Sequence, residues 1–424
     1  MPKKTHLGSH LLSPETQMMH YGYEPTLSEG AVKCPQFQTT TFVFKKAQDG
    51  KDFFNYASGR VPVPEGIPEP GLIYTRFNNP VLEILEGRIA IWDDAEDCMV
   101  TGSGMAAIST TLLALSQPGD IVIYSEPVYG GTDTLINNVL SQMNIKGVGF
   151  FISDGISGLK AAVETAKAMG PISVVFVETP DNPNNNLIDI SICREIVDEN
   201  NSNAEKPATL VVDNTMFGPI FQQPLRHGAD ICLYSLTKYI GGHSDAVGGS
   251  CSGKKDLITR IRGFRNIMGT TMDPNTAWLI MRSLETLSIR MKASSASAEK
   301  VVQYLQSHPK VNKINYCGLL TEEDSQHAIY QKQCTGSGST FSFEIAGDEA
   351  TAFKVLDSMQ IAMLAVSLGG TETLVQHPAS MTHSSVPEER RLQIGITDSL
   401  IRISIGIENT ADIIADLDQA LANI

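Results

Sequence analysis

The sequence is poor in cysteine, and its cysteines show no spacing that would serve a disulfide framework or a metal site. It has seven cysteines in 424 residues, an odd number, and no two are arranged as C-x-x-C. Small secreted domains that depend on disulfides carry more cysteines at paired spacings, and zinc sites need clustered ligands. We therefore expect free thiols in a reducing compartment, a cytoplasmic location and no bound metal.

Long apolar segments are also missing. The first 17 residues, MPKKTHLGSHLLSPETQ, contain two lysines but no apolar core of the kind that a secretory signal requires. The longest stretch without a charged residue, Cys98 to Gly119, has the length of a membrane span, but Ser, Thr, Gly and Gln residues interrupt it. A buried helix explains this composition better than a membrane span.

Positive charge is in short supply as well. Lys and Arg total 32 against 47 Asp and Glu, which gives a formal net charge of −15. Nucleic acids and anionic membrane surfaces would be repelled, so neither is an expected partner. The proportions of 42% hydrophobic and 19% charged residues are ordinary for a globular protein, and the chain is long enough for two or three domains with buried cores.

From about residue 80, the chain alternates helical patterns with short apolar runs. The first helical pattern, NPVLEILEGRIAIWDDAE, starts at residue 79. The apolar runs are rich in Val and Ile and are bounded by Gly, Pro, Asp or Asn, which is typical of buried parallel strands. We therefore predict an α/β protein with a mostly parallel sheet, whose ligands bind at the carboxyl ends of the strands. The predicted strands are 97–101, 120–125, 147–153, 173–179, 209–215 and 231–235.

The alternation of helical patterns and apolar runs is absent from the segments before and after this region. Residues 1–77 are predicted to form an irregular arm that lies on another surface, and their segment 59–71, GRVPVPEGIPEPG, is too rich in Pro and Gly for regular structure. An α/β domain over 78–276 and a smaller α+β domain over 277–424 would follow. In the C-terminal region we expect a long helical stretch over 274–308, a closing helix over 409–424, and strands at 338–345, 401–407 and near 363–369.

A glycine-rich turn follows the first predicted strand. Gly102, Gly104 and Ala107 match the dinucleotide-binding pattern G-x-G-x-x-[GA]. The acidic residue expected about twenty positions later is poorly represented, since Asp120 precedes the next strand and Glu126 lies in a loop-like segment. Two other interpretations of this turn stay open, a NAD-linked enzyme and a tight turn without a ligand. The small residues between a strand and a helix favour a turn whose backbone N–H groups bind a phosphate.

A lone lysine follows the last predicted strand of this region. In ICLYSLTKYIGGHS, Lys238 stands among apolar and small residues just after Ser235 and Thr237, and Asp213 ends the preceding strand. Burial of a lysine is costly and lowers its pKa, which makes the amine a nucleophile. A surface lysine whose stem packs on apolar residues is the plain alternative. Together with the Gly104–Met105 turn, these groups suit pyridoxal 5′-phosphate (PLP), which needs a lysine for its aldehyde, a carboxylate for its ring nitrogen and donors for its phosphate.

Eight stretches between residues 73 and 409 resemble, in order, the Cys/Met-metabolism (trans-sulfuration) family of PLP-dependent enzymes. The resemblance implies the PLP-dependent transferase fold type I, with a mostly parallel seven-stranded sheet domain, a smaller C-terminal α+β domain and an N-terminal arm. The matching stretches are IYTRFNNP, TGSGMAAI, EPVYGGT, VETPDNPNN, VVDNT, YSLTKYIGGHSD, AVSLGGTETLVQHPASMTHS and LIRISIGIEN.

The resemblance also implies roles for individual residues around the cofactor. Lys238 matches the lysine that bonds to the cofactor aldehyde, and Asp213 matches the carboxylate that holds the ring nitrogen. Tyr129 matches a tyrosine that stacks on the ring and serves as an acid or a base. The phosphate contacts are matched by Gly104, Met105, Ser235 and Thr237.

Further residues match contacts to the substrate and to a neighbouring subunit. Arg402 matches the arginine that grips the substrate α-carboxylate, a task suited to the guanidinium fork, and Ser367 lines the same pocket. Asn182 matches an asparagine near the cofactor O3′ and the substrate carboxylate. Tyr74 and Arg76 match residues that reach the phosphate of a neighbouring subunit, which implies a homo-oligomer with shared active sites, usually a dimer of dimers in this family.

The reaction type is predicted from the same resemblance. The segment AVSLGGTETLVQHPASMTHSSVPEERR is most similar to methionine γ-lyases, which predicts γ-elimination of methionine- or homocysteine-type substrates to 2-oxobutanoate, ammonia and a thiol. Val366 and Ile73 stand where cystathionine enzymes tend to carry glutamate, which favours a substrate with a short apolar tail. Bacterial methionine γ-lyases often carry a cysteine where this chain has Gly131, and a Lys-Asp pair where it has Arg265 and Asn266.

These departures leave other reactions of the family open. The alternatives are a cystathionine β- or γ-lyase, with amino-acid racemisation as a side activity, and O-acylhomoserine-dependent γ-replacement by a cystathionine γ-synthase or a sulfhydrylase. A non-catalytic PLP carrier is the remaining alternative, and it would have no use for the set formed by Lys238, Asp213, Tyr129 and Arg402.

Overall fold

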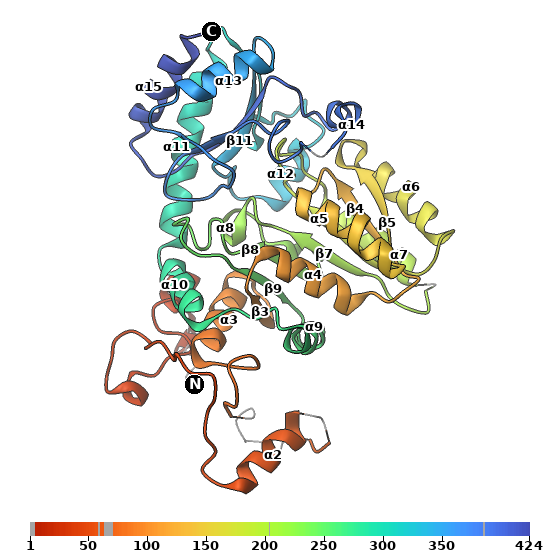
Figure 1. Ribbon diagram of the computed structural model, residues 1–424, viewed down its shortest axis with the longest axis vertical. Coiled ribbons are helices and arrows are strands. Elements are labelled where there is room, and N and C mark those ends of the chain that lie inside the picture. Colours follow the sequence, from red (N-terminus) through yellow and green to blue (C-terminus); the bar gives the residue numbers. More distant parts are fainter. Residues whose placement is uncertain (1–4, 58–59, 63–70, 203, 385) are drawn as a thin grey trace.

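The computed structural model describes residues 5–57, 60–62, 71–202, 204–384 and 386–424. Most of the predicted Pro- and Gly-rich insert at 59–71 therefore lies outside the described residues. Two sheets dominate the molecule, and the long helix α11 (Leu287–Gln306) runs from one to the other in Figure 1. The segment that carries α2 (Ala47–Ala57) projects away from both sheets.

The larger sheet has seven strands in the order β3-β9-β8-β7-β6-β4-β5. Strand β9 is antiparallel to its two neighbours, β3 and β8, and all other pairings are parallel. The predicted α/β class and mostly parallel sheet are confirmed. The strands are β3 (Asp97–Thr101), β4 (Ile121–Glu126), β5 (Lys146–Phe151), β6 (Ile172–Glu178), β7 (Thr209–Asp213), β8 (Ile231–Ser235) and β9 (Gly249–Gly253).

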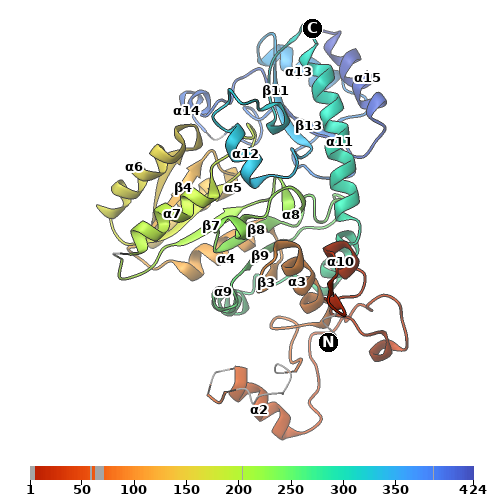
Figure 2. The ribbon, with the colours of Figure 1, turned by 180° about the vertical axis from the view of Figure 1, so that it is seen from behind.

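The central strands of this sheet are buried on both faces, which explains why their sequences are continuously apolar. On β7, Val211 faces a core formed with α4 and α9, whereas Leu210 and Val212 face a core formed with α6 and α7. Helix α4 is in front in Figure 1, and α7 is in front in the reverse view of Figure 2. These helices are α4 (Gly104–Leu115), α6 (Gly155–Lys167), α7 (Ile190–Asn201) and α9 (Lys255–Met268).

Strand β9 is the one strand of the larger sheet that the apolar runs did not reveal. Its sequence, GSCSG, has none of the β-branched residues that mark the other strands. The close approach of neighbouring backbone explains its glycines, because a Cβ at Gly249 would lie 2.2 Å from the carbonyl oxygen of Ser103, and one at Gly253 2.4 Å from that of Asp230. Strand β9 therefore requires small residues, and its sequence lacks the β-branched residues by which a strand is usually predicted.

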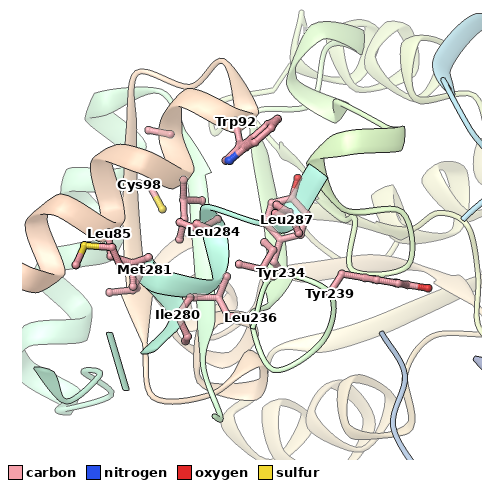
Figure 3. Packing of buried hydrophobic residues seen from close by; sticks show 14 of the residues in the cluster. Leu85, Trp92, Cys98, Tyr234, Leu236, Tyr239, Ile280, Met281, Leu284 and Leu287 are labelled. Atoms are coloured by element: carbon pink, nitrogen blue, oxygen red, sulfur yellow. The ribbon is translucent and has the colours of Figure 1, made fainter. Parts of the chain in front are cut away.

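A second apolar core holds the turn that follows β8. Helices α3 (Pro80–Asp93) and α10 (Pro274–Leu284) pack here against the sheet, as Figure 3 shows. Leu236 and Tyr239, on either side of Lys238, are both buried in this core. The Tyr239 hydroxyl also lies 2.8 Å from Thr340 Oγ1 and 3.0 Å from Ser339 Oγ, in the smaller sheet and just before it. The backbone that carries Lys238 is thus fixed from two sides.

The smaller sheet has five strands in the order β10-β11-β14-β13-β12. Its core includes residues of α11, α13 (Glu349–Ser358) and α15 (Thr410–Leu421), the last of which confirms the predicted closing helix. Strands β11 and β14 confirm the predictions at 338–345 and 401–407, whereas β10 and β13 were not predicted. The strands are β10 (Val311–Asn315), β11 (Thr340–Ile345), β12 (Met363–Leu364), β13 (Leu374–Gln376) and β14 (Leu400–Ser404).

Two expectations for the C-terminal region were wrong in detail. The helical stretch predicted over 274–308 is divided into α10 and α11, because the helix ends at Leu284 and a new one begins at Leu287. The strand expected near 363–369 is limited to β12, since the following residues form the loop that carries Ser367. The predicted domain boundaries at 77/78 and 276/277 stay predictions.

The N-terminal segment has more regular structure than an irregular arm would. It contains α1 (Pro14–Gln17), α2 and a two-stranded ribbon of β1 (His6–Leu7) and β2 (His10–Leu11). No helix within the described residues is long and apolar enough to cross a membrane. The described chain also has no group of three or more His, Cys, Asp or Glu residues arranged to hold a metal ion.

A buried arginine ties α9 to α3 and β3. Arg265 is only 2% exposed, and its NH1 group donates to Glu86 Oε1 at 2.8 Å and to the carbonyl oxygen of Val100 at 3.0 Å. Glu86 Oε1 also accepts from the Val100 N–H group at 3.0 Å. Arg265, noted above as a departure from methionine γ-lyases, therefore belongs to the internal framework of the larger sheet.

Replacement of this arginine should destabilise the fold. In Arg265→Ala the buried Glu86 carboxylate would lose its 2.8 Å ion pair and keep Arg262 at 3.8 Å, so we expect the free energy of unfolding to fall by about 3 kcal/mol. Urea denaturation followed by circular dichroism measures the change. Arg260→Ala, at an exposed position on the same helix, is the matched control. Equal unfolding midpoints for the two variants would contradict a framework role for Arg265.

Candidate active site

The polar residues predicted for the site gather where the parallel strands of the larger sheet end. Glu178, Asp213 and Ser235 are the last residues of β6, β7 and β8. Their side chains share the face of the sheet that packs on α4, because they continue the alternation of Phe176, Val211 and Leu233. The carboxyl edge of the sheet is thus the candidate site, as predicted for open α/β sheets.

Lys238 lies in the turn after β8 with its amine directed to the smaller sheet. Its Nζ donates to Ser367 Oγ at 2.9 Å. Burial lowers the pKa of Lys238 to about 8, and the nearby positive charge of Arg402 contributes to the shift. The neutral amine, which attacks an aldehyde, is therefore far more populated near physiological pH than it would be for an ordinary lysine.

Ser367 connects this lysine to the arginine of the site. Its hydroxyl accepts from Lys238, and its carbonyl oxygen accepts from the NH2 group of Arg402 at 2.5 Å. The backbone of Ser367 has a φ of 131°, a conformation that costs a residue with a side chain about 1–3 kcal/mol. The loop between β12 and β13 therefore holds Ser367 in a strained position between the two cations.

Arg402 is a buried cation without an acidic partner among the described residues. It is 3% exposed on β14, and its NH1 group donates to Asn182 Oδ1 at 3.1 Å. With the Gln376 amide turned so that its oxygen faces the guanidinium, that oxygen accepts from Nε at 3.2 Å and from NH1 at 3.1 Å. Burial lowers the pKa of Arg402 to about 10. A small carboxylate that enters the site would supply the missing negative charge.

Asp213 is a buried acid that has no cationic partner among the described residues. It is 7% exposed, and its Oδ1 accepts from the N–H and the hydroxyl of Thr215 at 3.0 and 2.6 Å. Burial raises the pKa of Asp213, although the two Thr215 donors act in the opposite direction. A protonated ring nitrogen placed against this carboxylate would relieve the cost of its burial.

Tyr129 stands beside the start of α4. It is 46% exposed, and its backbone N–H donates to Glu178 Oε2 at 2.7 Å. A Cβ built at Gly131 would lie 2.7 Å from the Tyr129 ring and 2.8 Å from Met105 Sδ. Gly131 therefore packs closely against both side chains. The departure from cysteine at position 131 thus has a local reason, because a side chain there would displace Tyr129 or Met105.

The phosphate-binding residues predicted from sequence meet at one turn. Ser103 caps α4 by accepting from the Ala106 N–H at 3.0 Å, which leaves the amides of Gly104 and Met105 at the helix N-terminus. A Cβ at Gly104 would lie 2.9 Å from Ser235 Cβ, so the turn and Ser235 are in contact. The Thr237 hydroxyl bonds to the backbone of Gly248, at 3.1 and 3.3 Å. The assignment of Thr237 to the phosphate stays a prediction.

Tyr74 and Arg76 make their contacts elsewhere in the described chain. Arg76 donates to the carbonyl oxygen of Asn266 on α9, and its guanidinium lies 4.4 Å from the centre of the Phe77 ring. Tyr74 is 39% exposed and pairs with Thr41 through an isolated bridge. Within one subunit, neither is in hydrogen-bond contact with Lys238 or Asp213, and their part in a neighbouring subunit's site stays a prediction.

Several residues of the site were not singled out from sequence. Glu178 could have been found by the same signal as Asp213, because both are acids at the end of a buried strand. His383 is 3% exposed, and burial together with Arg402 and Arg391 lowers its pKa to about 4. Thr215 and Gln376 have no local signal, since only their contacts to Asp213 and Arg402 reveal them.

The residues present fit PLP. Its aldehyde, ring nitrogen and phosphate match an amine of lowered pKa at Lys238, an acid at Asp213 that has no cationic partner among the described residues, and a helix N-terminus at Gly104 that touches Ser235. The fit rests on Asp213 and Arg402, two buried groups whose charges have no partner of opposite sign among the described residues.

The family profile described as Cys/Met metabolism PLP-dependent enzyme matches residues 15–422 of the chain. The chain is 39% identical over 398 residues to L-methionine gamma-lyase of Fusobacterium nucleatum subsp. polymorphum, and the match covers 93% of this chain and 94% of that protein. It is 36% identical over 416 residues to cystathionine gamma-lyase of Bacillus subtilis, with coverage of 97% and 100%.

Solved structures of similar proteins have the same fold. A putative O-acetylhomoserine (thiol)-lyase from Campylobacter jejuni, described with a pyridoxyl-lysine monophosphate, superimposes with a TM-score of 0.87 at 31% identity, over 97% of this chain and 100% of that one. Cystathionine gamma-lyase from Lactobacillus plantarum gives a TM-score of 0.84 at 32% identity, over 97% of this chain and 99% of that one. The predicted fold type I is thereby confirmed.

The pKa of Lys238 can be tested through its reaction with the cofactor. Attachment of PLP needs the neutral amine, so the initial rate of attachment to cofactor-free protein should rise with pH and reach half its plateau at pH about 8. The extent is measured by borohydride reduction and peptide mapping. In Arg402→Gln the midpoint should move to higher pH, because one positive charge near the amine is removed.

Lys238→Ala is the control for labelling at other lysines. A midpoint near pH 10.5, the ordinary lysine value, would show that Lys238 is not desolvated.

Proposed function

The chain belongs to the Cys/Met-metabolism family of PLP-dependent enzymes, and from this premise we propose that it is a carbon–sulfur lyase that releases a thiol from methionine or homocysteine by γ-elimination. The products would be the thiol, ammonia and 2-oxobutanoate, with one water molecule consumed. Arg402, a buried guanidinium without an acidic partner in the described chain, is the observation that carries the proposal, because it calls for the α-carboxylate of an amino acid.

The line from Lys238 through Ser367 to Arg402 would set the position of the substrate. Because Ser367 contacts both Lys238 and Arg402, a carboxylate held by Arg402 would bring the substrate Cα near the lysine amine. A neutral amine at this position can remove the Cα proton and return it at a neighbouring carbon. This geometry supports an enzyme over a PLP carrier.

The other residues would support the same reaction. PLP, when bound, supplies an electron-accepting ring that stabilises negative charge at Cα. Asp213 would keep the proton on the ring nitrogen, and Ser235 with the Gly104–Met105 turn would hold the phosphate. Tyr129, whose ring is half exposed beside this turn, would protonate the departing thiolate.

Two apolar residues, at positions where cystathionine enzymes tend to carry glutamate, favour methionine-type tails. Val366 precedes Ser367 directly and is 59% exposed, and Ile73 adjoins Tyr74, which we assign to a neighbouring subunit's site. Neither side chain can pair with the second ammonium group of cystathionine. Cystathionine lysis remains a second candidate because of the similarity to the Bacillus subtilis enzyme, and O-acylhomoserine-dependent replacement because of the Campylobacter jejuni structure.

The proposal includes a homo-oligomer with shared sites, built as a dimer of dimers. The projecting N-terminal segment and the exposed Tyr74 near Arg76 support it, because a projecting segment and an exposed aromatic side chain can bury apolar surface against a second subunit. A cytoplasmic location is part of the same proposal. All seven cysteines are free, and six of them are buried, which suits a reducing compartment.

A keto-acid assay on the PLP-saturated protein tests the reaction. Methionine should give 2-oxobutanoate with an equal amount of methanethiol, and homocysteine should give it with an equal amount of hydrogen sulfide. Both should react at a higher kcat/KM than cystathionine or cysteine. O-acylhomoserine with and without a thiol runs beside them. Pyruvate from cystathionine as the main product, or replacement faster than elimination, would move the assignment to the second candidates. A lack of turnover with every substrate would favour the carrier.

The contribution of Val366 to specificity can be tested by adding a charge. In Val366→Glu a carboxylate beside Ser367 should attract the distal ammonium of cystathionine and disfavour the methionine methyl group. We expect the ratio of kcat/KM for cystathionine to that for methionine to rise about tenfold, the value of one ion pair of about 1.4 kcal/mol. Val366→Gln, which has the same size without the charge, is the control. An unchanged ratio in both variants would place the specificity elsewhere.

A further inference from the structure

Two carboxyl groups lie side by side at the edge of the larger sheet. Glu178 and Asp213 are register partners on the neighbouring parallel strands β6 and β7, so their side chains leave the sheet on the same face. They are 5% and 7% exposed. Asp213 already has a role in the proposed function, whereas Glu178 has none.

Two buried carboxylates at adjacent positions cannot both be ionised without a cation between them. Burial and the neighbouring charge of Asp213 hold the pKa of Glu178 well above its usual range, and Asp181, in the loop after β6, raises it further. Both charged neighbours that act on Glu178 are therefore acids. Ionisation of one of the two acids therefore disfavours ionisation of the other.

The hydrogen-bond donors around the pair indicate which group keeps the proton. Asp213 receives two donors, the N–H and the hydroxyl of Thr215, at 3.0 and 2.6 Å. Among the described residues, the Glu178 carboxyl receives one donor, the backbone N–H of Tyr129 at 2.7 Å. Donors stabilise the ionised form, so the charge belongs on Asp213 and the proton on Glu178.

The single donor on Glu178 also fixes the loop that carries Tyr129. The Glu178 N–H donates to Ser125 Oγ at 3.0 Å, and its side chain accepts from the Tyr129 N–H, so the residue joins β6 to both ends of the loop after β4. The Tyr129 side chain is 46% exposed and gains little from packing, so its position depends on such backbone contacts.

We propose that Glu178 is a positioning residue whose uncharged carboxyl fixes Tyr129 through its backbone N–H and leaves Asp213 as the single negative charge facing the cofactor ring nitrogen. An uncharged Glu178 can hold Tyr129 without adding a second negative charge near the ring nitrogen, which a charged Glu178 would do. Tyr129 is held by a neutral group, and the full attraction for the ring nitrogen comes from one direction. The inference rests on the proposed binding of PLP at Lys238 and Asp213.

The test compares Glu178→Gln and Glu178→Ala in the holoenzyme. Glutamine keeps the acceptor for the Tyr129 N–H and is neutral at every pH, whereas alanine removes the acceptor. Glu164→Gln, an exposed position on α6 whose carboxylate pairs only with Lys167 in the described chain, is the control for loss of a surface charge. The readouts are the pH titration of the visible absorbance of the Lys238-bound cofactor, the dissociation constant of PLP, and kcat with methionine.

The absorbance midpoint of Glu178→Gln should agree with that of the wild type to within about 0.3 pH unit. The alanine variant should turn over at least about tenfold more slowly than the glutamine variant, with a smaller change in KM, because Tyr129 is no longer held. Thermal unfolding of both variants separates this effect from a loss of folded protein.

A decrease of the midpoint by about one pH unit or more in Glu178→Gln would overturn the inference, because it would show that a negative charge had been removed. Equal kcat values for the glutamine and alanine variants would overturn the positioning role. Absence of a Lys238-dependent absorbance in the wild type would instead refute the proposed function itself.

Discussion

The guanidinium of Arg402 is buried with neutral partners alone, and the rest of the site is organised around that unbalanced charge. Its hydrogen bonds reach Asn182 from the larger sheet, Gln376 from the neighbouring strand and the backbone of Ser367. A buried cation of this kind is costly unless an anion joins it. The fold therefore retains a charge whose full compensation comes only with an acidic ligand.

Other buried ionisable groups lie where the two sheets meet. The larger sheet contributes Lys238, Asp213 and Glu178, and the smaller sheet contributes Arg402. The low polarity that makes each charge expensive also lowers the pKa of Lys238 and raises that of Asp213. A ligand with an anionic group and a protonated ring would meet both sides at once, and the chemistry of PLP with an amino acid has that character.

The framework that sustains this site is rigid where the reactive groups are attached. Lys238 lies between the buried residues Leu236 and Tyr239, and the Tyr239 hydroxyl contacts the smaller sheet. Ser367 is kept at an unfavourable backbone angle beside it. Backbone strain at Ser367 and buried charge at Arg402 and Asp213 occur together here, whereas the cores on the two faces of the sheet are apolar packing.

Much of the fold and half of the site could be predicted from the sequence. Apolar runs located six of the seven strands, and a lone lysine, an acid at a strand end and a glycine turn pointed to the cofactor. Strand β9 was missed because GSCSG has only small residues, and Glu178, Thr215 and Gln376 were missed because their roles depend on contacts with distant residues.

The sequence by itself determined where strands and helices occur and which reactive groups are available, because periodicity and side-chain chemistry are local properties. Only the tertiary structure decided that Glu178 stands beside Asp213 and that Ser367 joins Lys238 to Arg402. Those relations depend on the order of the strands and on how the two sheets meet. The pKa values that give the groups their reactivity arise from the burial that this packing imposes.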